Sequence, residues 1–182
     1  MDSFITSELQ YTTGGVAKTV IVSHPEVPHA RQAAVKLFLD AKCELVPDLM
    51  NMPSWLGVIP SHLRELLFKS KPAVFPYYKL AIRPNNPLAS SEMAMLSEIR
   101  ELRHISISHP FLDENVVLAM SRLVHPEVIV IHSSSFSDGI SGAFPHQSSI
   151  RLIDIQGTPV TKIGLGKIST MCPHARVYSD IA

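Results

Sequence analysis

The sequence has no excess of charge of either sign. Its 182 residues include 16 lysines and arginines and 16 aspartates and glutamates, so the formal net charge at pH 7 is zero. Non-specific binding to nucleic acid or to an anionic membrane surface depends on net positive charge. We therefore predict that neither is a partner of this chain.

The sequence also lacks long apolar segments. Hydrophobic residues make up 46% of the chain, but its apolar runs, such as residues 33–39 with Lys36 inside, are short. A membrane-spanning helix needs roughly 20 apolar residues, so we predict no transmembrane segment. The segment Met1–Ile5 has neither the basic start nor the apolar stretch of a signal peptide. We expect an intracellular protein, in the cytoplasm or, as the alternative, in an organelle.

Cysteine is scarce. The two cysteines, Cys43 and Cys172, are far apart in the chain, and neither belongs to a CxxC pair. A disulfide framework or a zinc knuckle requires more cysteines at closer spacing. We expect both to be buried thiols.

A complete phosphate-binding loop is missing as well. Residues 12–19 read TTGGVAKT, but Thr12 and Ala17 occupy both positions where such a loop requires glycine. Lys18 leads into the strand-like run Val20–Val22 rather than into a helix. We therefore predict no nucleotide cofactor.

Histidine is frequent, with nine in the chain, yet the histidines form no recognisable metal motif. His104, His109, His125 and His132 show no helical i, i+4 pair and no matching set of carboxylates. We expect His104 and His132 to lie on the surface.

A run of serines lies beside residues that could complete a hydrolase triad. Ser133–Ser135, His132 and Asp138 include the residue types of such a triad but lack the G-x-S-x-G turn that exposes a nucleophile. We predict a non-enzymatic protein, with no catalytic residue, metal, cofactor or small-molecule substrate.

A repeating pattern dominates the second half of the chain. Apolar residues recur with an apolar-x-x-apolar-x-apolar spacing, or most of it, in segments about 24 residues apart. Each segment alternates like a strand with one buried face. The segments are Tyr77/Leu80/Ile82, Leu102/Ile105/Ile107, Pro126/Ile129/Ile131 and Ile150/Ile153/Ile155, with a fifth step ending on Tyr178. Such units bury their apolar edges by stacking, which predicts a solenoid.

One unit carries a family resemblance. Residues 150–178 read IRLIDIQGTPVTKIGLGKISTMCPHARVY and resemble a leucine-rich repeat of the cysteine-containing, F-box-associated type. The unit Leu102–Leu123 fits the same frame, and Asn85 occupies the place of the family's ladder asparagine. The resemblance implies an α/β leucine-rich-repeat solenoid, a short horseshoe of about five or six repeats with parallel strands on its concave face. An ordinary α/β or α+β domain with evenly spaced strands is the alternative.

The first part of the chain is less regular. We divide the chain into irregular N-terminal repeats or a cap at residues 1–74 and leucine-rich repeats at 75–182, within a single continuous domain. In the first part we expect strands at Ala17/Val20/Val22 and Leu56/Val58, helices over about 29–41 and from Ser61, and an insertion or distorted repeat at Cys43–Pro53.

The repeat register predicts which side chains face outward from the strands. They are Lys79, Ala81, Arg83, His104, Ser106, Ser108, Val128, Val130, His132, Leu152, Asp154 and Gln156. Val128, Val130 and Leu152 would form an apolar centre within a polar rim, which is the anatomy of a protein-binding face; β-branched residues that merely suit a strand surface are the alternative. A second candidate contact is the C-terminal strand edge at Val177 and Tyr178, where a solenoid end needs cover.

These features predict a non-enzymatic interaction module. By the resemblance, the chain is a leucine-rich-repeat scaffold or accessory subunit whose partners are the other proteins of a multi-subunit complex. The alternative is a substrate-recognition adaptor of a ubiquitin ligase, since residues 59–68, IPSHLRELLF, are similar to the start of an F-box helix.

Overall fold

The computed structural model describes residues 4–13, 15–48 and 50–181. Its main feature is a six-stranded sheet in which the strands follow chain order. The strands are β3 (Glu44–Pro47), β4 (Tyr77–Ile82), β5 (His104–Ile107), β6 (Val128–Ile131), β7 (Leu152–Asp154) and β8 (Arg176–Tyr178). Strands β4 to β8 run parallel, whereas β3 is antiparallel to β4. The predicted α/β class and the parallel strands of the second half are confirmed.

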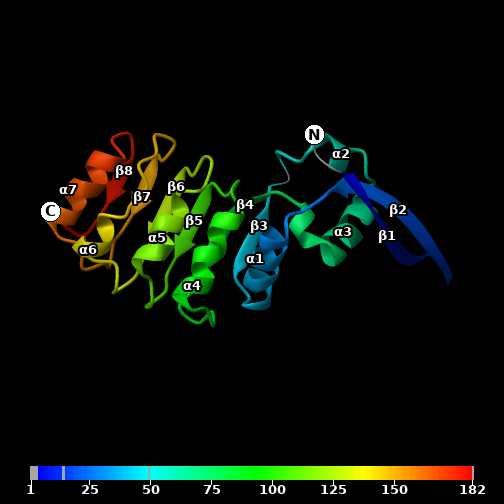
Figure 1. Cartoon of the computed structure of the whole chain (residues 1–182), viewed down its shortest axis with the longest axis horizontal. Helices are drawn as coiled ribbons and strands as arrows, with labels where there is room; N and C mark the ends of the chain where they lie inside the picture. The colour runs from blue at the N-terminus through cyan, green and yellow to red at the C-terminus, as the bar shows by residue number, and fades with distance from the viewer. Residues whose placement is uncertain (1–3, 14, 49, 182) are drawn as a thin grey trace.

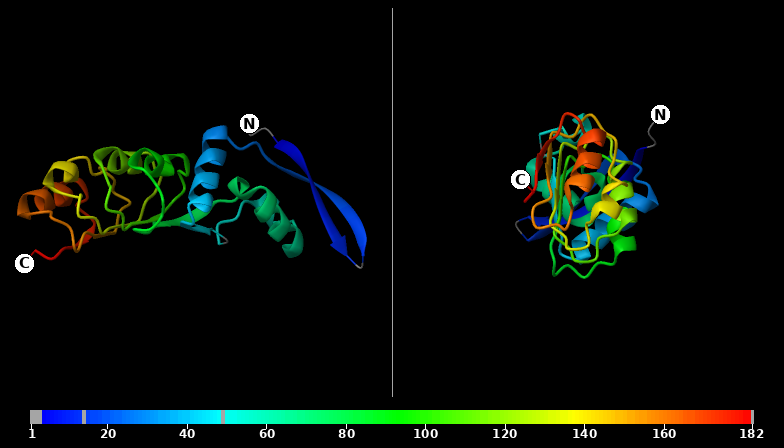
Figure 2. Two further views of the ribbon diagram at one scale, coloured as in Figure 1. Left: turned by 90° about the horizontal axis from the view of Figure 1, so that it is seen from below. Right: turned by 90° about the vertical axis from the view of Figure 1, so that its left-hand side faces the viewer.

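Short helices connect the strands and gather on one face of the sheet, as the left view of Figure 2 shows. They are α1 (His29–Asp40), α4 (Ser90–Met93), the 3₁₀ segment η2 (Ala94–Glu98), α5 (Glu114–Met120), α6 (Asp138–Ser141) and α7 (Lys162–Met171). Figure 1 shows the same row of helices in front of the strands. Within the described ranges, no helix is both long and apolar enough to cross a membrane.

The strand register aligns the apolar repeat positions. Leu80, Ile105, Ile129, Ile153 and Val177 lie side by side on neighbouring strands. The first four are fully or almost fully buried and pack with the helices in one core. The fifth step therefore ends on Val177, and its prediction at Tyr178 is wrong by one residue because the last crossover is one residue shorter than expected.

The main core also includes the N-terminal helix. Ala34, Val35 and Phe38 of α1 are buried in the same cluster as the sheet residues. The helix begins after Pro28 and covers the β3 end of the sheet. The helix predicted at about 29–41 is confirmed, and residues on both sides of position 74 share this core.

A two-stranded hairpin stands apart from the main sheet. Strand β1 (Phe4–Thr13) pairs antiparallel with β2 (Val16–Pro25) and extends beyond the β3 end of the molecule. The strand predicted at Ala17/Val20/Val22 exists, but it is not a member of the repeat sheet. Its partner is the preceding segment, because a tight turn at Gly15, with φ of 78°, reverses the chain there.

The hairpin packs on a second, smaller core. Helices α2 (Ser54–Gly57) and α3 (Ser61–Ser70) and the 3₁₀ segment η1 (Pro72–Val74) supply most of its partners. Leu9, Val22, Leu56, Leu67 and Phe75 are its buried members. The predicted helix from Ser61 is confirmed. The predicted strand at Leu56/Val58 is wrong, because Pro53 starts a helical turn that turns Leu56 inward.

The segment Cys43–Pro53, predicted as an insertion or a distorted repeat, contributes a strand to the main sheet. It contains β3, which extends the sheet antiparallel to β4, with Leu45 opposite Leu80. Cys43 is buried beside this strand, and desolvation by burial raises the pKa of its thiol to about 11. Cys172 is also buried, at the end of α7. Both predictions of buried thiols are confirmed.

Buried polar side chains follow the strands at the turns. The Asn86 amide donates to the Ala41 carbonyl at 2.8 Å, and its Oδ1 accepts from the Arg83 backbone N–H at 2.6 Å. His109 Nε2 lies 3.3 Å from the Asn86 carbonyl oxygen. Asn85 is exposed. Asn86 rather than Asn85 is therefore the asparagine that this turn directs inward.

Gly164 marks the close packing of α6 against α7. A Cβ atom at Gly164 would lie 2.9 Å from both Ser141 Oγ and Val160 Cγ1 and would overlap the Asp138 carboxylate. That carboxylate accepts a hydrogen bond from the Thr161 backbone N–H at 2.7 Å. The glycine in the repeat is thus required by the packing of the two helices.

Candidate functional site

The candidate site is the face of the sheet opposite the helices. Its side chains alternate with the buried ones along each strand, since β5 and β6 both show a half-buried, buried, half-buried, buried pattern. Two rows cross the face in register. The first row is Lys79, His104, Val128, Leu152 and Arg176, and the second is Ala81, Ser106, Val130, Asp154 and Tyr178.

These rows contain most of the outward positions predicted from the repeat. A third set, Arg83, Ser108, His132 and Gln156, follows the second row at or just beyond the strand ends. Ala81 is the exception to the predicted exposure, because it is only 8% exposed. It pairs with Glu44 of β3, where the antiparallel strand adds a neighbour that the repeat pattern does not contain.

Apolar side chains occupy the middle of this face. Val128 and Val130 belong to β6 and Leu152 belongs to the neighbouring β7, and all three are half-buried. Val128 lies directly beside Leu152 in the strand register. Tyr178 adds a 40% exposed ring on the far side of Asp154. The structure therefore brings the predicted apolar centre together on two adjacent strands.

Paired polar side chains lie around the apolar centre. Glu44 accepts hydrogen bonds from Lys79 Nζ at 2.7 Å and from an Arg83 guanidinium N–H at 3.2 Å. On the other side, His132 Nε2 lies 3.5 Å from an Asp154 carboxylate oxygen. The predicted rim of charge and histidine is thus organised into pairs across neighbouring strands.

The pairs around Glu44 make a pH dependence predictable. Hydrogen bonds from Lys79 and then Arg83 lower the pKa of Glu44 from its usual 4.5. A carboxyl group whose pKa is lower in the folded state stabilises the fold above pH 4.5, and this contribution is lost as the pH falls through the lowered pKa. We expect Glu44→Gln to reduce the dependence of the unfolding free energy on pH below 4.5. Urea unfolding at several acidic pH values measures this pH dependence.

A matched variant controls for the general effect of removing a carboxylate. Glu26→Gln changes an exposed carboxylate at the start of the loop before α1. It removes one carboxylate from the chain and leaves the contacts of Glu44 with Lys79 and Arg83 in place. If both variants reduce the dependence of the unfolding free energy on acidic pH equally, the contacts of Glu44 with Lys79 and Arg83 are not the source of that dependence.

His104 lies at the border between the charged and apolar parts of the face. Its ring centroid is 5.0 Å from that of Tyr78, and Tyr78 Oη lies 3.4 Å from His104 Nδ1. Desolvation by burial lowers the pKa of His104, and the neighbouring Glu127 opposes this effect. His104 is therefore neutral near pH 7 and contributes a polar ring rather than a positive charge.

The C-terminal strand forms one open edge of the sheet. Val177 is half-buried beside Ile153, whereas Tyr178 faces outward beside Asp154. The Arg176 guanidinium lies 5.4 Å from the centre of the Tyr178 ring. Along the described chain, β8 pairs with β7 alone. The predicted edge residues therefore have two different environments, and only Tyr178 belongs to the outward face.

The residue types of a hydrolase triad do not converge. The Ser133 and Ser135 hydroxyls bond to each other at 2.9 Å, and Ser135 also donates to the Leu112 carbonyl. Asp138 is engaged with Thr161 instead. Within residues 4–13, 15–48 and 50–181, no group of three or more histidine, cysteine or acidic side chains could hold a metal ion.

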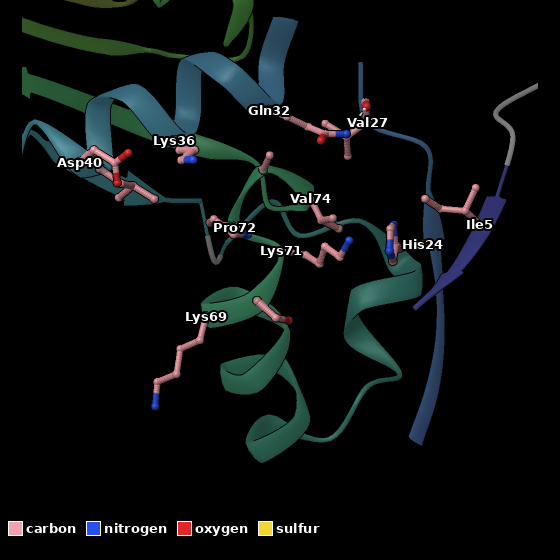
Figure 3. Close-up of a pocket in the computed structure, with 13 residues that line it drawn as sticks. Ile5, His24, Val27, Gln32, Lys36, Asp40, Lys69, Lys71, Pro72 and Val74 are labelled. Carbon is pink, nitrogen blue, oxygen red and sulfur yellow. Dashed lines mark hydrogen bonds between the residues drawn. The ribbon is translucent and has the colours of Figure 1, made fainter. Parts of the chain in front are cut away.

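A cleft lies between the hairpin and the helices. Its volume is about 470 Å³, and it is bounded by β1, β2, α1, the end of α3, and η1. Figure 3 shows its histidine, His24, and its carboxylate, Asp40, at opposite ends. Lys36, Lys69 and Lys71 are the other charged residues of its lining. His24 bonds to Ser7 Oγ at 2.7 Å, so the cleft does not join an acid and a base.

The F-box-like segment is largely occupied within the chain. Leu63 and Leu67 of α3 are buried, and Leu67 packs in the core beneath the hairpin. The exposed side of the helix carries an ordinary surface ion pair between Lys69 and Glu65. Ile59, Leu66 and Phe68 of the same segment are half-buried.

The repeat register did not predict one row of charged residues, which lies just before the starts of β5, β6 and β7. Arg103 Nη1 donates to Glu127 Oε1 at 3.1 Å. Arg103 comes directly before β5, and Glu127 comes directly before β6. The Glu127 N–H bonds to the Arg103 carbonyl, and the Arg151 N–H bonds to the Glu127 carbonyl. The 24-residue spacing of these alternating charges was a usable signal, because residues at equivalent positions of neighbouring units become neighbours in space.

No family model, no curated protein and no solved structure matches this chain.

Proposed function

We propose that this protein is a non-enzymatic interaction module, a scaffold or accessory subunit of a multi-subunit complex, whose open sheet face binds another protein. The leucine-rich-repeat solenoid belongs to the same proposal, with each parallel strand and the helix after it as one unit. Fold alone does not determine function, so the proposal depends on the open face itself.

The strand register supports the solenoid. From β5 to β8, residues that pair on neighbouring strands are always 24 positions apart in the sequence. The first paired residues of these strands are His104, Val128, Leu152 and Arg176. Each crossover contains a helix that packs on the same side of the sheet. Repeated units that contact only their neighbours in chain order are the defining feature of a solenoid.

The apolar centre of the open face carries the binding proposal. Val128, Val130 and Leu152 lie in register on two strands and remain half-exposed, although the opposite face of the same strands is fully buried. The Lys79–Glu44 ion pair lies toward the β3 edge of this face, and His132 and Asp154 lie next to each other at the ends of β6 and β7. An apolar centre with a polar rim is the arrangement that protein partners recognise.

The double variant Val130→Glu/Leu152→Glu tests this face. It places two carboxylates in the apolar centre, so a partner that covers the face would have to bury unpaired charge. We expect loss of a defined partner set in an affinity pull-down of the native tagged protein followed by mass spectrometry. The circular dichroism spectrum should stay unchanged, because both side chains point away from the core.

Leu118→Glu is the matched control. Leu118 is a 46% exposed apolar residue on α5, on the opposite side of the sheet. This variant should keep the same partners as the wild type. Partners that survive in the double variant would contradict the role of the open face, as would equal losses in both variants.

A further inference from the structure

The hairpin is the one part of the described chain that forms its own sheet with two unpaired edges. Strands β1 and β2 each span 10 residues, and they pair only with each other. Figure 2 shows the ribbon extending past the helices at the end of the molecule. Exposed strand edges offer rows of unpaired N–H and C=O groups, which soluble proteins normally cover or interrupt.

The register identifies the residues that offer these groups. Thr13 and Val16 flank the turn and form the first hydrogen-bonded pair of the ribbon. From there, non-hydrogen-bonded and hydrogen-bonded pairs alternate along the two antiparallel strands. The pairs Thr12–Ala17, Gln10–Thr19, Glu8–Ile21 and Thr6–Ser23 therefore direct their backbone groups to the open edges. Their eight side chains are exposed and lie on one face of the ribbon, because alternate residues share a face.

The two edges differ in the position of their charge, since Glu8 lies in the middle of β1 whereas Lys18 lies near the turn end of β2. Two copies of β1 that pair about the middle of the strand would therefore bring their Glu8 carboxylates near each other. The outward residues of β2 are Ala17, Thr19, Ile21 and Ser23, which carry no charge. Ile21 is 67% exposed. The β2 edge is thus the one that is compatible with a second copy of itself.

The middle of the β2 edge lacks the usual protective devices. Residues 19–22 read TVIV, a run with high β-propensity and neither charge, proline nor glycine. Lys18 lies nearer the turn. In antiparallel registers centred on Val20 or Ile21, Lys18 lies opposite Val22 or His24 rather than opposite its own copy. Two copies of Lys18 therefore do not face each other across the new ladder.

We propose that two copies of the chain associate through their β2 strands. The strands run antiparallel about a twofold axis and form a continuous four-stranded sheet in the order β1-β2-β2-β1. A twofold interface uses the same surface on both copies, and an antiparallel pair of identical strands satisfies this condition. Ile21 of each copy loses solvent exposure against the other strand. The open face of the main sheet stays free for a partner protein.

Two proline variants at directly opposed positions test this pairing. Thr19→Pro removes an outward N–H from the β2 edge, and Gln10→Pro removes its counterpart from the β1 edge. Neither N–H belongs to the ladder within the hairpin, so proline is tolerated at both positions as on other edge strands. We expect a wild-type dimer in analytical ultracentrifugation, a dimer for Gln10→Pro, and dimerisation weakened by about tenfold or more for Thr19→Pro.

Amide hydrogen exchange supplies a second readout that does not depend on any variant. The Thr19 and Ile21 amides should become more protected as the protein concentration rises, and the Gln10 amide should not. A wild type that stays monomeric at concentrations of about 100 μM would overturn the proposal. So would a dimer that Gln10→Pro weakens as much as Thr19→Pro, or a monomer whose β2 edge binds a strand of a different protein.

Discussion

Arg31→Ala is expected to lower the free energy of unfolding by about 3 kcal/mol. Arg31 on α1 forms a two-pronged ion pair with Glu101, with distances of 2.5 and 2.8 Å. It also donates to the Ala73 and Phe75 carbonyls at 3.0 and 2.8 Å. Its side chain is 16% exposed, so removing it leaves a half-buried carboxylate and two carbonyl oxygens without their donor.

The position of Arg31 explains why the effect is large. Glu101 precedes β5 and also accepts from the Tyr77 backbone N–H at 3.0 Å. Arg31 thereby joins the N-terminal helix, the segment before β4 and the segment before β5. Glu101 is 34% exposed, which keeps the expected effect at the lower end of the range for buried ion pairs.

Chemical denaturation of three variants tests this network. Arg31→Lys keeps the charge but cannot reach four acceptors with a planar fork, so it should recover only part of the loss. The double variant with Glu101→Gln should cost less than the sum of the single changes, because the two residues act together. An Arg31→Ala protein within about 0.5 kcal/mol of the wild type would contradict the role assigned to this network.

Ile129→Ala alone is also expected to lower the free energy of unfolding, by about 3 kcal/mol. Ile129 is fully buried at the centre of the aligned row, between Ile105 and Ile153. Truncation removes buried methyl and methylene groups and leaves a cavity that neighbouring strands cannot close. Thermal or urea unfolding monitored by circular dichroism measures the loss.

The adjacent residue provides the control for the strand's two faces. Val130 is half-buried on the open side, so Val130→Ala should cost less than about 1 kcal/mol. A large difference between neighbouring truncations is expected only if the strand faces are assigned correctly. Equal losses from both would mean that the open face is covered in the free protein.

The second half of the chain shows how far local patterns reach. The apolar alternation predicted β4, β5, β6 and β7 and which of their faces is buried, because a strand's periodicity is a property of adjacent residues. The even spacing predicted that these strands are neighbours. It did not predict that Val177 rather than Tyr178 aligns with Ile153, because one residue of crossover length decides the register.

The first half shows where local patterns stop. Val20 and Val22 look like the repeat strands in sequence, yet their partner is β1 and their core is the one beneath the hairpin. Leu45 belongs to an antiparallel strand of the main sheet. Strand partners come from non-local pairing, which the alternation of a single segment does not specify.

The candidate site divides in the same way. Val128, Val130, Leu152 and most of the predicted rim were predicted from periodicity and lie together. The partner of Lys79 is Glu44, which is 35 residues away in the chain, and His109 is buried. These contacts depend on how β3 and the turns pack.

The sequence by itself therefore determined the parallel strands, their buried face and the N-terminal helix, since these follow from spacing within about one repeat. Only the tertiary structure decided the antiparallel β3, the separate hairpin with its open edges, and the Arg31–Glu101 network, which joins residues 70 positions apart. The physical reason is that contacts between distant segments depend on the path of the whole chain between them. The residues of one segment do not specify that path.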